Sequence, residues 1–284
     1  NRSLRVLDGL VFLFSAVDGV EPQSETNWRL ADNYKVPRIG FVNKMDRQGS
    51  NFLMVCKQVR EMLKSNAVPI VLPIGDEADF RGVVDLVTNR AIIWHEDNMG
   101  ATFDEVPIPE DMVAEVKQYR AELIEAVAEY DETLMEKFFE DEDSITVEEV
   151  NAALRAAVMD MSIIPMICGS SFKNKGVQFL LDAVCRYLPS PLDKEAIVGT
   201  NPDTDLPITR KPDVKEPFAA LAFKVSKIVS TNNKSQPPFI RASTCCLYAM
   251  RKSSNVTALY PGSFTSGDML AVLLVGPIDP ATKR

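Results

Sequence analysis

The sequence predicts an α/β fold in which a doubly wound, mainly parallel sheet carries an inserted acidic α+β subdomain. Three observations lead to this prediction. Two continuous apolar runs, Leu7 to Gly19 and Val36 to Asp46, each precede a helical pattern. An acidic segment, Ile70 to Asp160, then interrupts this alternation. A third apolar run, "IIPMICGSS", follows the acidic segment and returns to the first pattern.

The first two apolar runs are typical of strands that are buried on both faces. The run from Leu7 to Gly19 is bounded by Asp-Gly on both sides, and helical spacing follows it over 21–35, with Pro22 in the first turn. After the second run, an amphipathic helix is predicted over 51–66, and another over 176–188 ends before Pro189. The order strand, helix, strand, helix favours right-handed βαβ units.

The acidic segment has its own pattern and an unusual charge. It begins with strand-like alternation and continues with a long helical region, which we expect to break near Tyr130 to Thr133. A last helix has Thr146 as its cap and Glu149 three residues later. From Ile70 to Asp160 there are 24 Asp and Glu against 6 Lys and Arg, a net charge of −18, which leaves +9 on the rest of a chain of net charge −9. This asymmetry indicates an inserted module whose acidic surface either binds a partner or is simply solvated.

Composition excludes several classes of protein. With 284 residues, 46% of them hydrophobic, the chain can bury a core in one large domain or two modest ones. No apolar stretch approaches the roughly 20 residues of a membrane span, and "NRSLRVLDG" is not a signal peptide. Five cysteines show neither disulfide-framework nor zinc-ligand spacing, and a single histidine argues against a histidine triad. We therefore expect a cytoplasmic protein with no membrane contact.

Polar residues end the second predicted strand. The stretch "FVNKMDR" places Asn43, Lys44 and Asp46 at its carboxyl end, where ligands bind in doubly wound sheets. An ionised Asp46 can accept two parallel hydrogen bonds from the ring N–H and the exocyclic amine of guanine, a donor pair that adenine lacks. Lys44 can lay its methylene stem across the base, and Asn43 can tie neighbouring loops together. The pattern N-K-x-D thus indicates a guanine site, with a plain surface turn as the alternative.

A second strand-end loop strengthens the guanine hypothesis. "CGSSFKNKG" follows the third apolar run, again at a carboxyl end. Ser170 can support Asp46, and the backbone N–H of Ser171 or Phe172 can meet the carbonyl oxygen of the base. Two loops of one sheet that both suit guanine are more specific than either alone.

With these residues in view, the sequence resembles bacterial elongation factor G, a family of translational GTPases. The resemblance covers about Arg2 to Lys224 and rests on segments such as "GFVNKMDR", "GSSFKNKGVQFLLDAV" and "YLPSP". Asp46 and Ser170 stand 124 positions apart, which leaves room for the acidic insert of this family. The resemblance implies a P-loop-GTPase-type sheet, incomplete at its N-terminus, with an inserted α+β acidic subdomain and the start of a β-barrel domain.

The resemblance also implies a function. Members of this family drive translocation of tRNA and mRNA on the ribosome with GTP and Mg²⁺. By resemblance, Asn43, Lys44, Asp46 and Ser170 to Phe172 bind the guanine of GTP or GDP. The ribosome is the implied partner, through ribosomal RNA and through the large-subunit stalk protein at the acidic insert; tRNA and mRNA are contacted only indirectly. The protein is expected to be a monomer.

Two departures from the family pattern shape these expectations. No G-x-x-x-x-G-K-[ST] pattern occurs in the chain, and the magnesium ligands and the water-positioning histidine would precede Asn1. His95 lies in the insert and is expected to have a structural or surface role. We therefore expect a fragment with no catalytic residue of its own, which binds guanine weakly and does not hydrolyse GTP alone. The missing first strand should leave a strand edge exposed.

The predicted domain boundaries follow the pattern of the chain. The predicted parts are the distal GTP-binding domain (1–68), the acidic insert (69–161), the end of the GTP-binding domain (162–190), a linker (191–217) and the start of a second, β-barrel-like domain (218–284). After Val225 the sequence departs from the family, and a frameshifted or chimeric gene end is favoured over a divergent β domain.

Three other interpretations stay open. The first is a paralogous translational GTPase of the ribosomal-protection or release-factor type. The second is a non-catalytic module that binds the ribosomal stalk through the acidic insert alone. The third is a partial gene product without a function of its own.

Overall fold

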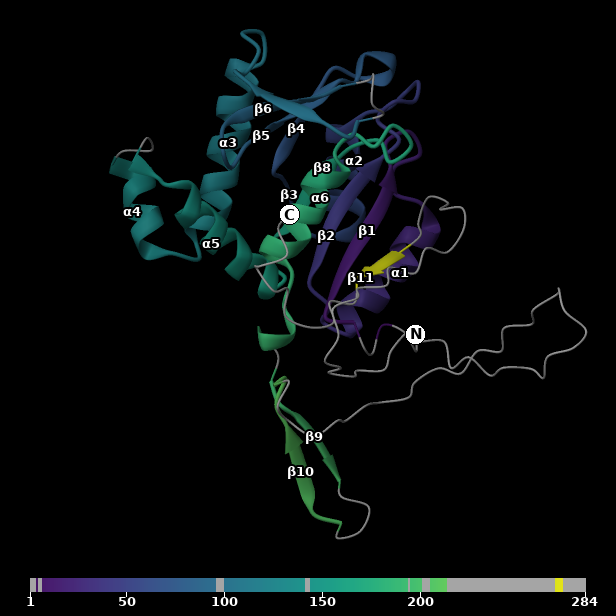
Figure 1. Ribbon diagram of the computed structural model, residues 1–284, viewed down its shortest axis with the longest axis vertical. Helices are drawn as coiled ribbons and strands as arrows, with labels where there is room; N and C mark the ends of the chain where they lie inside the picture. The colour runs from purple at the N-terminus through teal and green to yellow at the C-terminus, as the bar shows by residue number, and fades with distance from the viewer. Residues whose placement is uncertain are drawn as a thin grey trace, which may run out of the picture. The chain divides into compact units, whose positions relative to one another are not determined.

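The computed structural model describes residue 4 and residues 7–95, 100–140, 144–193, 195–200, 205–213 and 269–272 (Figure 1). These residues fall into two compact units. One holds Gly9–Leu188 together with 269–272, and the other holds the remaining described residues. The first unit contains both predicted guanine loops.

A five-stranded sheet forms the centre of the first unit. Its order is β11-β1-β2-β8-β3. The strands β1 (Gly9–Ser15), β2 (Arg38–Asn43), β8 (Ile164–Cys168) and β3 (Ala67–Pro69) are parallel, whereas β11 (Met269–Val272) is antiparallel to β1. The helices α1 (Pro22–Asn33) and α2 (Phe52–Leu63) follow β1 and β2, and α6 (Val177–Tyr187) follows β8. The predicted α/β class with a mainly parallel sheet is confirmed.

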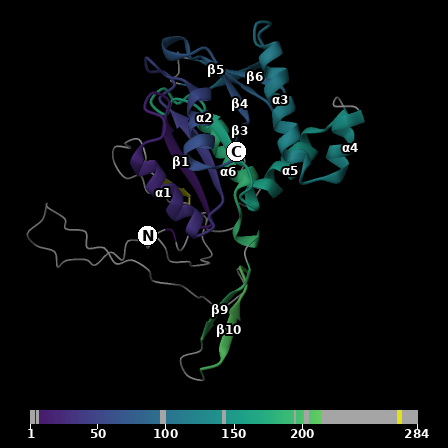
Figure 2. The same ribbon diagram turned by 180° about the vertical axis from the view of Figure 1, so that it is seen from behind.

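Both faces of this sheet are covered, because residues on opposite sides of β1 meet different segments of the chain. Phe12 packs edge-on against Trp28 of α1, with ring centroids 5.0 Å apart. Gly9 faces the other side, where a Cβ atom would lie 3.1 Å from the side chain of Leu188, just after α6. Figures 1 and 2 both show α1 alongside β1. The sheet is therefore doubly wound, and its continuous apolar runs are explained by burial on both faces.

A second, antiparallel sheet and three helices lie between β3 and β8 in the chain. The strands are β4 (Val71–Ile74), β5 (Gly82–Asp85), β6 (Arg90–Trp94) and β7 (Phe103–Val106), paired in that order. A short 3₁₀ turn, η2 (Glu77–Asp79), joins β4 and β5. The helices are α3 (Val113–Ala128), α4 (Glu132–Glu140) and α5 (Val147–Met159). The break between α3 and α4 lies where the sequence predicts it.

The start of α5 is a capping box, and it provides a test of stability against pH. Thr146 accepts a hydrogen bond from the N–H of Glu149, and the Glu149 carboxylate accepts one from the N–H of Thr146. The hydrogen bond from Lys137, and then those from Thr146, lower the pKa of Glu149 to about 2. Because the folded pKa is below the unfolded one, this stabilisation is present above about pH 4.5 and is lost as the pH falls towards 2.

We expect Thr146→Ala to lower the free energy of unfolding by about 1 kcal/mol at pH 7. Urea denaturation at several pH values measures this loss and its pH dependence. The acid-induced loss of stability should be smaller in Glu149→Gln than in the wild type. Equal acid profiles for the two proteins would contradict the role of this carboxylate.

The predicted linker, 191–217, contains regular structure over part of its length. In the second unit, β9 (Ile197–Thr200) and β10 (Pro207–Arg210) form an antiparallel pair, preceded by a 3₁₀ turn, η4 (Pro191–Asp193). Five of the eight residues of these strands are β-branched, but each strand is only four residues long and one of its positions is Gly199 or Pro207, so the pair leaves little periodicity to detect.

One correction concerns the edge of the main sheet. The sequence pattern assigns Met269–Val272 to a second domain, but this strand pairs with Gly9 to Phe12 of β1. The edge that we expected to be exposed is therefore paired along this stretch, and the free N–H and C=O groups of β1 explain why a β-prone segment adds there. Residues 214–268 and 273–284, which hold most of the predicted β-barrel-like domain and its atypical tail, lie outside the described residues.

Candidate guanine-binding site

The loops after β1, β2 and β8 meet at one edge of the main sheet. In the parallel register, Ser15 stands opposite Asn43 and Val42 stands opposite Cys168. Because parallel strands end together, the segments that follow them are neighbours. The structure thus brings the N-K-x-D segment beside the loop Gly169–Gly176, which we call the second guanine loop.

Asn43 joins these two loops through its side-chain amide. Its Nδ2 donates to Ser171 Oγ at 2.9 Å, and its Oδ1 accepts from the backbone N–H of Ser171, also at 2.9 Å. A backbone hydrogen bond from the N–H of Met45 to Gly169 O, 3.2 Å long, adds to this pair. Two loops 128 positions apart in sequence are therefore held together by a reciprocal amide pair.

Lys44 adopts a left-handed backbone conformation, with φ of 68°, and points towards the loop after β1. Its Nζ lies 3.5 Å from Asp18 Oδ2, which also accepts a hydrogen bond of 2.7 Å from Ser15 Oγ. The hydrogen bond from Ser15, and to a smaller extent the Lys44 ammonium, lower the pKa of Asp18. Asp18 therefore holds the Lys44 ammonium beside the loop that follows β1. Neither Asp18 nor Ser15 was predicted as a site residue.

Asp46 is the one carboxylate of the N-K-x-D segment, and it is half-buried. Among the residues that the structure describes, Asp46 has neither a hydrogen bond nor an ion pair. Removing a carboxylate from water without a partner is unfavourable. A half-buried, unpaired carboxylate beside two joined loops is suited to accept hydrogen bonds from a ligand.

The second guanine loop is closed at its base by its own backbone. Ser170 is 1% exposed and exchanges two backbone hydrogen bonds with Lys175. Its hydroxyl accepts from the N–H of Lys173 at 3.2 Å, so in this structure Ser170 supports its own loop rather than Asp46. Within the described part of the chain, the N–H of Phe172 has no acceptor, whereas that of Ser171 bonds to Asn43. Phe172 is 88% exposed.

Replacing Asn43 tests how the loops are joined. In Asn43→Ala, Ser171 loses both of its hydrogen bonds to Asn43, so we expect its amide to exchange with solvent at least about fivefold faster, at a cost of about 1 kcal/mol. Amide hydrogen exchange measures this directly. Asn89→Ala, at a turn in the insert, is the control, and identical Ser171 exchange in the two variants would contradict the proposed junction.

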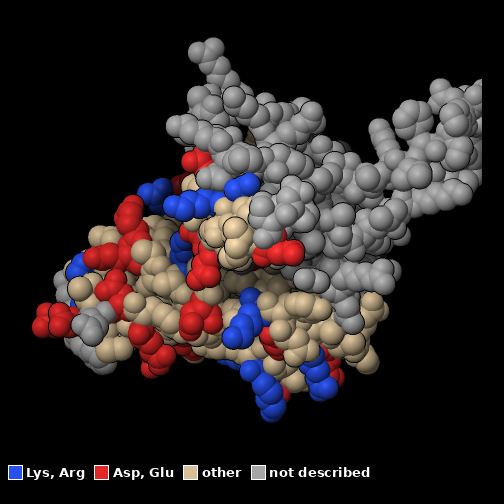
Figure 3. Space-filling view, turned by 90° about the horizontal axis from the view of Figure 1, so that it is seen from below, with Lys and Arg blue, Asp and Glu red and all other residues tan. Residues whose placement is uncertain are grey.

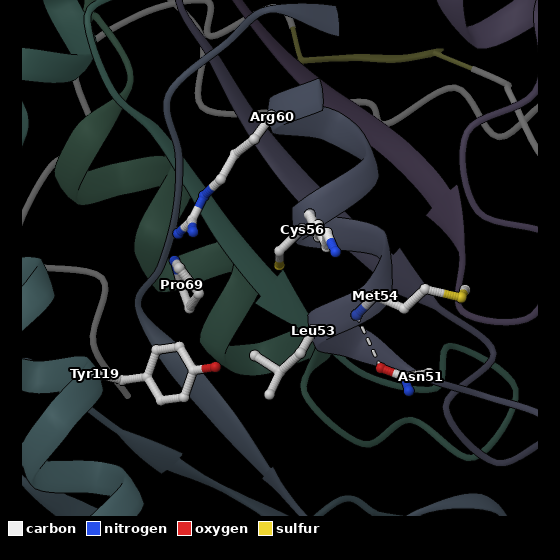
Figure 4. A pocket seen from close by; sticks show the side chains of 8 residues that line it. Asn51, Leu53, Met54, Cys56, Arg60, Pro69 and Tyr119 are labelled. Atoms are coloured by element: carbon white, nitrogen blue, oxygen red, sulfur yellow. Dashed lines mark hydrogen bonds between the residues drawn. The ribbon is translucent and has the colours of Figure 1, made fainter. Parts of the chain in front are cut away.

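Two other features of the described residues, a cavity and His95, lie away from the two loops. A cavity of about 420 Å³ lies apart from the loops, between α2, Pro69 and Tyr119 of α3 (Figure 4). It contains none of the six predicted residues. His95 is exposed in the insert and lies 2.9 Å from Asp104, away from the two loops. None of the described helices is long and apolar enough to cross a membrane.

Comparison with known proteins places these features in a family. Residues 1–190 match the family described as "Elongation factor Tu GTP binding domain". The chain is 71% identical to "Elongation factor G" of Cytophaga hutchinsonii over 226 residues, which are 80% of this chain and 32% of that protein. It is 61% identical to the protein of the same name from Amoebophilus asiaticus over 225 residues, 79% of this chain and 32% of the relative.

A solved structure shows the same fold. A crystal structure of a Thermus thermophilus protein has a TM-score of 0.61 and 28% sequence identity, and the match covers 69% of this chain and 29% of that one. The chain spans about a third of the length of the curated relatives that it matches. The resemblance to elongation factor G is confirmed, and the match over residues 1–190 shows that the chain belongs to the elongation factor Tu GTP-binding-domain family.

Proposed function

We propose that the edge formed by Asn43, Lys44, Asp46 and the second guanine loop binds the base of GTP or GDP. The observation that carries this proposal is the unpaired, half-buried carboxylate of Asp46 beside the Asn43–Ser171 pair. Asp46 accepts from the ring N–H and the exocyclic amine of guanine, and the free N–H of Phe172 donates to the base carbonyl oxygen. The stem of Lys44 covers the base face.

The residues of this edge fit the base of the nucleotide, and no metal ligand is assigned among them. The Asp46 carboxylate matches the donors of guanine, and the Phe172 N–H matches its carbonyl oxygen. In the described part of the chain, no group of three or more His, Cys, Asp or Glu residues is placed to hold a metal ion. The base-binding residues thus select the nucleotide, whereas no step of hydrolysis is assigned to residues of this chain.

We further propose that the chain belongs to a translation elongation factor G, a cytoplasmic GTPase that moves tRNA and mRNA through the ribosome. The identities of 71% and 61% to proteins of that name support this proposal. A translational GTPase of another type remains the alternative. GTP hydrolysis and Mg²⁺ belong to the proposed whole protein.

Titration of the chain with GDP and with ADP, by calorimetry or fluorescence, tests base recognition. We expect weak GDP binding and at least about tenfold weaker ADP binding, because adenine cannot satisfy Asp46 and leaves it unpaired. Equal affinities, or no GDP binding at millimolar nucleotide, would contradict the proposal.

The acidic insert favours a second function, as a docking surface for the ribosomal stalk protein. Exposed carboxylates gather on the three helices of the insert, and Figure 3 shows acidic side chains over the side that carries α4 and α5. They are Glu115, Glu125, Glu129, Glu136, Glu140 and Glu148. A surface of one sign attracts a basic partner and raises the association rate.

Charge reversal tests this docking proposal. We expect Glu125→Lys with Glu129→Lys to weaken binding of the isolated stalk protein by about fivefold or more at low salt, and the difference to shrink as salt is added. The control reverses Asp182 of α6, an exposed carboxylate outside the insert. Equal losses in the two variants would contradict docking on the insert.

A further inference from the structure

Both guanine loops are held from outside by one short segment of the acidic insert. This segment, Glu77–Phe80, consists of η2 and the residue after it, and we call it the brace. It contacts the N-K-x-D side through Glu77 and the second guanine loop through Phe80. The two contacts are made by different chemical groups, so they can be tested separately.

On the N-K-x-D side, the brace acts through Gly49 and Ser50. The carboxylate of Glu77 accepts from the N–H of Gly49 at 2.7 Å, and the N–H of Glu77 donates to Ser50 Oγ at 3.3 Å. Ser50 in turn donates to Met45 O at 2.9 Å. Since Met45 lies between Lys44 and Asp46 and is 1% exposed, this chain of contacts reaches the base-reading residues from the insert.

On the other side, the brace meets the buried side chain of Lys175. Its Nζ donates to Phe80 O at 2.9 Å, and Lys175 is only 1% exposed. Lys175 also closes the base of the second guanine loop through its backbone bonds to Ser170. A buried ammonium is held only where its hydrogen-bond partners are fixed. The position of Ser171 and Phe172 therefore depends on the insert.

A second contact of the insert supports the same loop. Gly100 O accepts from Asn174 Nδ2 of the loop at 3.4 Å and from Gln178 Nε2 of α6 at 2.8 Å, and Gly100 has a φ of 70°. A Cβ atom there would lie 2.7 Å from Lys173 O and 2.8 Å from Asn174 O. The insert and the loop thus touch backbone to backbone, with no space for a side chain between them.

We propose that Glu77 and Lys175 are positioning residues for guanine recognition: they do not touch the base, but they fix the two loops that do. This inference rests on the proposed guanine function. The affinity for GDP then depends on Glu77 of the insert and on Lys175 at the base of the second guanine loop, neither of which lies in the N-K-x-D motif. A generally destabilising change would instead affect the fold without a preference for one base.

Glu77 provides the first test, because it is half-buried and its replacement leaves the core intact. In Glu77→Ala we expect the GDP dissociation constant to rise about fivefold to tenfold, with residual ADP binding unchanged. Glu77→Gln should restore most of the affinity, since its amide oxygen still accepts from Gly49. Glu105→Ala, which removes an exposed ion pair with Arg90 in the same insert, is the matched control.

The second test measures amide hydrogen exchange, without nucleotide, in Glu77→Ala, in Lys175→Met and in the control. We expect faster exchange at Met45 and Arg47 in Glu77→Ala, and at Ser171 and Lys173 in Lys175→Met, with the control unchanged. GDP affinity within about twofold of wild type in Glu77→Ala overturns the inference. If the wild type binds no GDP, the proposed guanine function fails. Amide exchange then tests only whether Glu77 and Lys175 fix the two loops: faster loop exchange in the variants supports this contact, and unchanged exchange overturns it.

Discussion

Asp46→Asn is expected to change the base preference of the chain from guanine to xanthine. Xanthine carries a carbonyl oxygen where guanine has its exocyclic amine. The side-chain amide that the substitution introduces can donate to that oxygen and still accept from the ring N–H. Loss of the charged acceptor should weaken GDP binding by about 10-fold to 100-fold, whereas XDP binding should improve.

Competition titrations with GDP, XDP and ADP measure this change in preference. Asp182→Asn is the matched control, because it makes the same chemical change at an exposed position of α6. An unchanged preference for GDP over XDP in the Asp46 variant would remove Asp46 from its assigned role. A loss of all nucleotide binding with an intact melting transition would also do so.

Trp28→Ala is expected to be the most destabilising of the changes considered. Trp28 is 1% exposed, packs against Phe12 and Phe14, and donates from Nε1 to Ser65 Oγ at 2.9 Å. The guanidinium of Arg38, itself 2% exposed, lies 4.5 Å above its ring centroid. The substitution leaves a large cavity and an incompletely covered cation, so we expect a loss of about 3–5 kcal/mol.

Urea denaturation at 25 °C measures this loss. Phe103→Ala, at an aromatic residue of β7 that is 45% exposed, should cost less than about 1 kcal/mol and is the control. A loss below about 1 kcal/mol in Trp28→Ala would show that α1 does not anchor the sheet. A loss of several kcal/mol is a large part of the stability of an ordinary domain.

The strands and helices of the first unit were predictable because the burial of each element leaves a regular apolar pattern in its sequence. Apolar runs such as that of β1 are continuous since both faces are covered, and the Thr146–Glu149 spacing marks the start of α5. The candidate site residues could be proposed from the sequence because polar groups follow buried strands. Asp18 could have been found by the same rule, since it lies at the polar end of the first run.

Other features leave no local signal in the sequence. The β9–β10 pair is short and mostly exposed, so it has no apolar alternation. The pairing of β11 with β1 depends on which strand edge is free, and that is a property of the assembled sheet. The contacts of the brace also leave no local signal. Glu77 and Lys175 are 98 positions apart, and nothing in the sequence around either residue indicates that its side chain holds a neighbouring loop.

Amide NMR of the isotope-labelled chain with added GDP shows whether the two loops bind the base. We expect shift changes on addition of GDP that are concentrated at Asp46 and at Ser170 to Phe172, and much smaller ones with ADP. Changes centred instead on the cavity of Figure 4, at Leu53, Arg60 and Tyr119, or none at the two loops, would contradict this expectation.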